Sequence, residues 1–250
     1  MSNGKLAPII IWLSFVCLLF SRAENVKAQV VVSDSLTGAQ LLDYITGQHV
    51  TVSNAVLTCS PAGAGIFTTI NSNIGLDSGI ILTTGMVATD MGGQWIGADN
   101  QQAALASFGA NIPGDAQLAS VLLSPTYDAC RLDFDFISTF DTVLFNYVFS
   151  SEEYDDFSCT GYNDAFAFFI SGPGISGFQN IALIPGTNIP IAINSTTDLI
   201  VTQTTQLTPC TDMGPGSPFS QYYVDNSNGT SISYFGFTTV LEAKAPVTAG

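Results

Sequence analysis

The fold is decided by residues 142–174, which read TVLFNYVFSSEEYDDFSCTGYNDAFAFFISGPG. Two apolar runs in this stretch, Val143–Phe149 and Ala165–Ile170, are rich in Phe, Val, Tyr and Ile, which is the composition of buried β-strands. The second run ends at Ser171-Gly-Pro-Gly174, a sequence typical of turns. An acidic segment that contains a cysteine joins the runs. The stretch therefore predicts two buried strands with oxygen ligands at one end.

Other segments on both sides of this stretch also have strand composition. In Arg131–Ile137, apolar side chains alternate with charged ones, which predicts that Asp133 and Asp135 share the outer face of a strand. Further strands are expected at Val50–Leu57, Gly65–Ile70, Gly79–Thr84, Ile181–Ile184, Ile189–Ile193, Tyr222–Val224, Ser231–Tyr234 and Phe237–Glu242. So many short strands predict an all-β fold, a two-sheet sandwich of the jelly-roll type.

One helix is expected near the N-terminus. Its apolar stripe consists of Leu36, Leu41, Leu42 and Ile45. Asp34 or Ser35 is the expected N-cap, and Gly47 is the expected end of the helix. A long excursion rich in Gly, Ala and Gln, Asp90–Leu123, shows weak helical patterning at Gln101–Phe108 and Ala116–Leu122. We expect short helices there, covering an edge or an end of the sheets.

The first 28 residues have the features of a secretory signal peptide. Lys5 precedes the apolar run Ile9–Phe20, and small residues that suit cleavage follow it. We expect cleavage after Ala28, so that the mature chain begins at Gln29. The run is too short for a spanning helix, and we expect no membrane insertion after cleavage. The sequence therefore predicts an exported protein, secreted or held at a bacterial cell surface.

The mature chain would be strongly acidic. Cleavage removes three of the five basic residues and one of the twenty acidic residues, so two basic and 19 acidic residues remain, a net charge of −17. With only Arg131 and Lys244 left, the chain has no basic patch for nucleic acid or for an anionic membrane surface. The acidity does not indicate disorder, because 46% of the residues are hydrophobic.

Four cysteines remain in the mature chain, and they are Cys59, Cys130, Cys159 and Cys210. An even number of cysteines in an exported chain indicates disulfides, and four cysteines allow three pairings. We favour a bond between Cys159 and Cys210, because both lie in polar loops. We expect residues 29–250 to form a single domain, since a chain of about 220 residues suffices for one sizeable core.

Catalysis is not favoured by the sequence. The only histidine, His49, has no evident partner, so a serine or cysteine hydrolase lacks its base. Paired carboxylates are the remaining catalytic option, and the pairs are Asp133 with Asp135 and Glu152 with Glu153. A secreted glycan-processing enzyme that uses such a pair is therefore the alternative to a non-catalytic protein.

The acidic segment between the two apolar runs suggests a calcium site. Calcium binds six to eight oxygen atoms from carboxylates, amides and carbonyls, which loops of this kind supply. The expected ligands are Glu152, Glu153, Asn163, Asp164 and, from the other end of the chain, Asp225. The other interpretation is that these carboxylates cap turns and face solvent.

Six ordered blocks of sequence form a distinctive pattern. They are Ser72–Gly85 (SNIGLDSGIILTTG), Phe149–Tyr154 (FSSEEY), Asn163–Gly174 (NDAFAFFISGPG), Asn180–Thr187 (NIALIPGT), Tyr223–Asn226 (YVDN) and Gly236–Leu241 (GFTTVL). Together they resemble the choice-of-anchor L domain family, from about Val50 to the C-terminus. The resemblance implies an exported bacterial surface module, typical of Bacteroidota, that different proteins join to different C-terminal anchors or sorting domains.

This resemblance also sets the expected function. No enzymatic activity or ligand is settled for the family, so we expect a non-catalytic surface module for adhesion or for binding an extracellular glycan or protein. Family members usually continue past a segment such as Pro246–Gly250 into another strand. We therefore expect a domain that is truncated at its C-terminus and has an exposed sheet edge.

Overall fold

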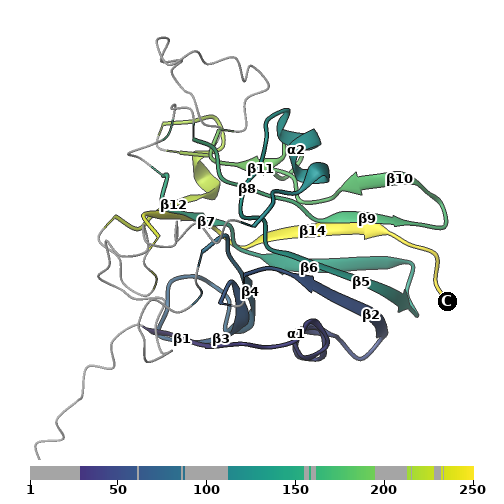
Figure 1. Cartoon of the computed structure of the whole chain (residues 1–250). Helices are drawn as coiled ribbons and strands as arrows, with labels where there is room; N and C mark the ends of the chain where they lie inside the picture. The colour runs from purple at the N-terminus through teal and green to yellow at the C-terminus, as the bar shows by residue number, and fades with distance from the viewer. Residues whose placement is uncertain are drawn as a thin grey trace, which may run out of the picture.

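The computed structural model describes residues 29–60, 62–85, 87, 112–154, 158, 162–194, 213–214, 216–227, 232 and 234–250. Strands dominate this part of the chain, which confirms the all-β prediction (Figure 1). Some of the predictions fall outside the described residues. They are the expected signal peptide, the helix expected at Gln101–Phe108, and the two cysteines Cys159 and Cys210. Within the described residues, none of the helices is long and apolar enough to cross a membrane.

The first strands of the described chain form a three-stranded antiparallel sheet. Strand β1 (Gln29–Asp34) pairs with β3 (Ala64–Ile70), and β3 pairs with β4 (Ser78–Leu82). The sequence analysis assigned no strand to β1, although its run of valines is typical of one. Val30 and Val32 of this strand are buried against Phe67. The first residues of the expected mature chain thus belong to the core.

Helix α1 (Gly38–Ile45) begins later than the sequence suggested. Its N-cap is Thr37, whose hydroxyl accepts a hydrogen bond from the backbone N–H of Gln40, while the Gln40 side chain accepts one from the N–H of Thr37. This is a capping box. Asp34 cannot cap the helix because it still belongs to β1, and Ser35 has a positive φ of 62°. The predicted cap was therefore wrong.

Strands β2 (Val50–Thr58) and β5 (Arg131–Ser138) form an antiparallel pair. Asp133 and Asp135 are exposed, and the apolar residues between them are half-buried, as the alternation predicted. A register shift in β2 lies beside Asn54, which has a positive φ of 56° and donates a hydrogen bond of 2.6 Å to Asp135. Helix α1 packs against β2.

The remaining strands form small antiparallel ladders. Three of them are pairs: β6 (Thr142–Tyr147) with β14 (Leu241–Pro246), β8 (Ala165–Phe166) with β11 (Ile191–Ala192), and β9 (Phe169–Gly172) with β10 (Ile175–Asn180). The fourth has three strands, in which β13 (Gly236–Thr238) lies between β7 (Ser150–Ser151) and β12 (Tyr223–Asp225). A short 3-10 helix, η2 (Ser220–Tyr222), precedes β12. In Figure 1, β10, β9, β14, β6, β5 and β2 follow one another across the molecule. The two-sheet, jelly-roll arrangement stays a prediction.

Three expected strands are broken because the chain changes its pairing partner. The run Val143–Phe149 pairs with β14 up to Tyr147 and then crosses to β13, where Phe149 and Thr238 exchange hydrogen bonds. The run Ala165–Ile170 changes from β11 to β10. The run Phe237–Glu242 divides between β13 and β14.

Two further predicted strands are shorter or more irregular in the structure. The expected strand Ile181–Ile184 is an extended segment that is held by an isolated bridge between Leu183 and Pro190. The expected strand Ile189–Ile193 is reduced to β11. Both segments are nevertheless central to the core, because Ala182, Ile184 and Ile193 are fully buried. Burial, rather than pairing, explains their apolar composition.

Helix α2 (Ala116–Leu122) lies where the sequence shows helical patterning. Its N-cap, Asp115, accepts hydrogen bonds from the backbone N–H groups of Gln117 and Leu118. The second carboxylate oxygen of Asp115 forms a 2.7 Å ion pair with Arg131 at the start of β5. These contacts fix the residues around α2 to the β2–β5 pair.

Replacing Gly114 with alanine should destabilise the fold by on the order of 2 kcal/mol. A Cβ atom at this position would collide with the backbone carbonyl of Thr126, and backbone on both sides would have to shift. Urea denaturation of the two proteins measures the change. Gly47→Ala is the matched control, since a Cβ at Gly47 meets no atom within 4 Å. Equal effects of the two substitutions would contradict the prediction.

Candidate functional site

The acidic residues of the central stretch are positioned by β7. This strand is only two residues long and lies against β13, where Gly236 pairs with Ser151. A Cβ at Gly236 would lie 2.7 Å from both Tyr154 and Tyr223, so glycine allows these rings to pack against the strand. Ser151 is 1% exposed. The residues that follow, 152–154, therefore start from a fixed and buried position.

A hydrogen-bond network links this turn to the start of β8. The hydroxyl of Ser151 donates to the Asp164 carboxylate at 2.7 Å, and it accepts a hydrogen bond from the backbone N–H of Glu153. The backbone N–H of Asp164 donates in turn to Glu153 Oε2 at 3.0 Å. The network brings Glu153 and Asp164 together, although eleven positions separate them in the sequence.

Glu152 has no such partner. Both of its carboxylate oxygens are shielded from solvent, and neither makes a hydrogen bond. Burial raises the pKa of Glu152 to about 7, and the charge of Asp164 contributes to the rise. A buried carboxylate without a donor or a cation is costly. Glu152 is thus the least satisfied side chain of the acidic cluster, which we define as Glu152, Glu153 and Asp164.

The pKa values of the other two members of the acidic cluster, Glu153 and Asp164, are also raised. Burial and the Asp164 charge raise the pKa of Glu153 to about 7, against the opposing hydrogen bond from Asp164. Burial also raises the pKa of Asp164, although the Ser151 hydroxyl partly offsets this effect. Within the described residues, no cation contributes to any of the three pKa values.

The charges of the acidic cluster influence two buried tyrosine hydroxyls. Tyr154 is completely buried, and its hydroxyl has no hydrogen-bond partner. Burial raises the pKa of Tyr154, and the charges of Tyr223 and Asp164 raise it further. Tyr234 lies within the electrostatic reach of Glu152 and Asp164, and its hydroxyl lies 3.3 Å from that of Thr83. The sequence analysis did not assign these tyrosines to the site, although Tyr154 is part of the FSSEEY block.

The other two expected ligands are occupied elsewhere. Asn163 exchanges hydrogen bonds with the backbone of Asn194, just after β11. Asp225 is exposed, and its carboxylate accepts a hydrogen bond of 2.8 Å from the N–H of Ser227, which lowers the pKa of Asp225. Among the described residues, no group of three or more His, Cys, Asp or Glu side chains could hold a metal ion as it stands.

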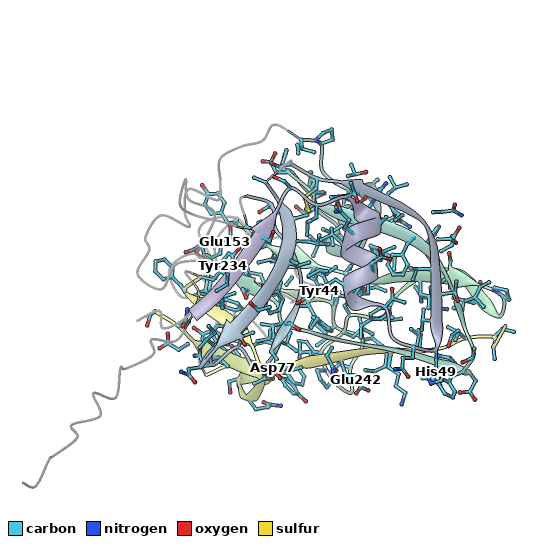
Figure 2. The ribbon with its side chains drawn as sticks, turned by 90° about the horizontal axis from the view of Figure 1, so that it is seen from below. Tyr44, His49, Asp77, Glu153, Tyr234 and Glu242 are labelled. Atoms are coloured by element: carbon cyan, nitrogen blue, oxygen red, sulfur yellow. A yellow bond between two sulfur atoms is a disulfide. The ribbon has the colours of Figure 1, made fainter. Side chains whose placement is uncertain are left out.

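The alternative catalytic residues lie in ordinary structural settings. His49 contacts the ring of Phe140, with ring centroids 4.7 Å apart. Figure 2 shows His49 at the opposite end of the molecule from Glu153 and Tyr234. Asp133 pairs with Arg131 at 2.7 Å, and Asp135 accepts a hydrogen bond from Asn54. Both of these aspartates lie on an exposed strand face.

One disulfide is present in the described residues. It joins Cys59 to Cys130, the two residues directly beyond the register pair Thr58 and Arg131. The disulfide therefore closes this end of the β2–β5 ladder covalently. The sulfur of Cys130 also contacts the carbonyl oxygen of Gly63. The favoured bond between Cys159 and Cys210 stays a prediction.

The comparison with protein families places the chain in one family. The sequence profile of the choice-of-anchor L domain matches residues 26–250, nearly the whole chain. The chain belongs to the choice-of-anchor L domain family. Choice-of-anchor L domains are modules of the surface-anchor type and not an enzyme family. No curated protein and no solved structure matches the chain.

Proposed function

We propose that the chain is an exported, non-catalytic module of a bacterial surface that binds an extracellular glycan or protein and is stabilised by calcium. The observation that carries the proposal is the family match over residues 26–250. Modules of the surface-anchor type act outside the cell, where disulfides persist, and the Cys59–Cys130 bond suits that environment.

The negative charge of the chain limits which molecules can bind to it. The described residues contain two cations, Arg131 and Lys244, and Arg131 is paired with Asp115 and Asp133. A polyanionic partner would therefore meet repulsion and little attraction. Neutral glycans and proteins with a basic or apolar contact surface fit the chain better.

An array of neutral and anionic glycans, with purified extracellular proteins on the same surface, tests this function. We expect saturable binding of the exported protein to one neutral glycan class or to one protein, with the bound glycan recovered intact. Shortened glycans after incubation would instead favour the alternative, a glycan-processing enzyme that uses paired carboxylates. Binding restricted to anionic glycans would contradict the charge argument.

A further inference from the structure

The loop that follows helix α2, residues 123–128, carries two strongly exposed hydrophobic side chains. Leu123 is 78% exposed and Tyr127 is 75% exposed, more than any other large hydrophobic side chain in the described residues. Pro125, which lies between them in the sequence, is also exposed. Single exposed hydrophobic residues are common on protein surfaces, whereas several on one short loop are typical of a binding site.

The backbone of Leu123 has a conformation that leucine rarely adopts. Its φ of 55° and ψ of 29° are left-handed, and its N–H donates to the carbonyl of Ala119 at the end of α2. Glycine is the usual residue at such a helix end, because it has no Cβ atom. The other non-glycine residues with a positive φ in the described chain are all serine, asparagine or aspartate. Leu123 therefore destabilises the fold, and its exposed side chain gains little from burial.

Hydrogen bonds hold the loop against the segment that precedes α2. The hydroxyl of Thr126 accepts a hydrogen bond of 2.8 Å from the N–H of Asp115 and donates one of 3.0 Å to the Asp115 carbonyl. The N–H of Asp128 donates to the carbonyl of Ile112, and Asp128 Oδ1 accepts the N–H of Ile112. A loop that is fixed at several points loses little conformational freedom when a ligand binds to its exposed side chains.

We propose that residues 123–128 form a binding site for a neutral glycan, in which a sugar ring stacks on the ring of Tyr127. The site rests on the proposed function and assigns a ligand class and a location to it. Stacking buries the apolar C–H face of the sugar on the aromatic ring and leaves the polar hydroxyls in contact with water. This role explains why an exposed leucine and an exposed tyrosine occur on a loop that is otherwise firmly held.

The small area of the apolar surface favours a glycan over a protein as the ligand. A large aromatic side chain provides at most about 250 Å² of contact area. Even three such side chains provide less than the roughly 800 Å² that each partner contributes to a standard protein interface. Leu123, Pro125 and Tyr127 together therefore suit a ligand that covers one aromatic ring and its immediate surroundings.

The ionic groups next to the loop favour a neutral glycan over an acidic one. Asp115, which holds Thr126, forms an ion pair of 2.7 Å with Arg131, and Arg131 forms a second one of 2.7 Å with Asp133. Two carboxylates therefore compensate the cation that the described contacts bring to this loop. An acidic or sulfated glycan would gain little from Arg131 and would be repelled by the net charge of −15.

A glycan array, probed with the exported protein, tests the site. It carries neutral oligosaccharides of glucose, galactose, mannose and N-acetylglucosamine beside sulfated and uronic-acid glycans, and calorimetric titration follows with the glycan that binds best. We expect a neutral glycan to bind. Tyr127→Ala should weaken its affinity at least about tenfold, as truncation of a central tyrosine commonly does. Tyr127→Phe should retain the affinity to within about threefold, because the aromatic ring remains.

Leu123→Gly distinguishes a binding role from a structural role. It should raise the melting midpoint by about 1–3 °C, because glycine suits the left-handed backbone, and it should weaken glycan binding. Phe140→Ala is the control and should keep the full affinity. Phe140 is 55% exposed, but it follows the end of β5, whereas Arg131, which is bonded to Asp115, lies at the start of that strand. A lower midpoint for Leu123→Gly, or an unchanged affinity for Tyr127→Ala, would overturn the proposal.

The outcomes also separate this site from the proposed function. If Tyr127→Ala does not fold, the original protein still decides, since saturating glycan should protect Tyr127 from iodination, and an unprotected Tyr127 would overturn the site. Binding to an acidic glycan alone, or to purified proteins on the same array but to no glycan, would reject this site and leave a binding function in place. Absence of binding to glycans and proteins alike would reject both.

Discussion

Replacing both Cys59 and Cys130 with serine should lower the free energy of unfolding by about 2–4 kcal/mol and the melting midpoint by about 5–15 °C. The disulfide closes a loop with a sequence separation of 71. Without it, the unfolded chain gains the conformational freedom of that loop, for which the chain-entropy model gives about 4 kcal/mol as an upper value. The β2–β5 ladder itself can persist, because its register pairs do not depend on the bond.

Urea denaturation of the double serine variant and of the original protein measures this loss. Dithiothreitol provides an informative comparison, because it also reduces any bond between Cys159 and Cys210. A larger loss in dithiothreitol than in the double variant would support that second disulfide. Identical midpoints for the variant and the oxidised original protein would show that the Cys59–Cys130 bond contributes nothing to stability.

Much of the fold could be predicted from periodicity and composition. The strict alternation in β5 places Asp133 and Asp135 outward, and the structure agrees. The strand Val50–Leu57 was predicted to within one residue of β2, because both of its ends are marked by polar or turn-forming residues. Local sequence therefore suffices where one strand keeps one partner over its whole length.

The interruptions in the central stretch could not be predicted in this way. Residues 148–149 and 167–168 are as apolar as the strands around them, yet the chain changes partner there. The change depends on distant groups: Thr238 bonds to Phe149, and the side chain of Asn180 accepts the N–H of Phe168. A pattern within one segment carries no information about such contacts.

The candidate site, too, could be predicted only in part from the local sequence. The sequence placed Glu152, Glu153 and Asp164 in one acidic segment, and the structure brings them together through Ser151. Asp225 is not among the described contacts of that cluster. Its exposed carboxylate instead accepts a hydrogen bond from the backbone N–H of Ser227. Burial distinguishes Glu152 from Asp225, and burial is a property of the folded chain rather than of the local sequence.

Stability should also fall as the pH rises from 5 to 8 in metal-free buffer. The pKa of Glu152 and that of Glu153 are about 7 in the folded protein, against an ordinary value of 4.5. Between those two values the folded state holds more protons than the unfolded chain, so raising the pH favours unfolding. The stabilising contribution is fully present below pH 4.5 and is lost as the pH passes 7. The raised pKa of Asp164 acts in the same direction.

The expected loss is on the order of 2 kcal/mol, after discounting for the part of each side chain that water reaches. Urea denaturation in EDTA at pH 5, 6, 7 and 8 measures it. Glu152→Gln combined with Glu153→Gln should flatten the dependence, because neither amide titrates and the amide oxygen introduced by the second substitution can still accept the Asp164 N–H. Asp225→Asn should keep the full slope, since the lowered pKa of Asp225 places its titration below this range. Equal stability at pH 5 and pH 8 would mean that the acidic cluster is far better solvated than its burial indicates.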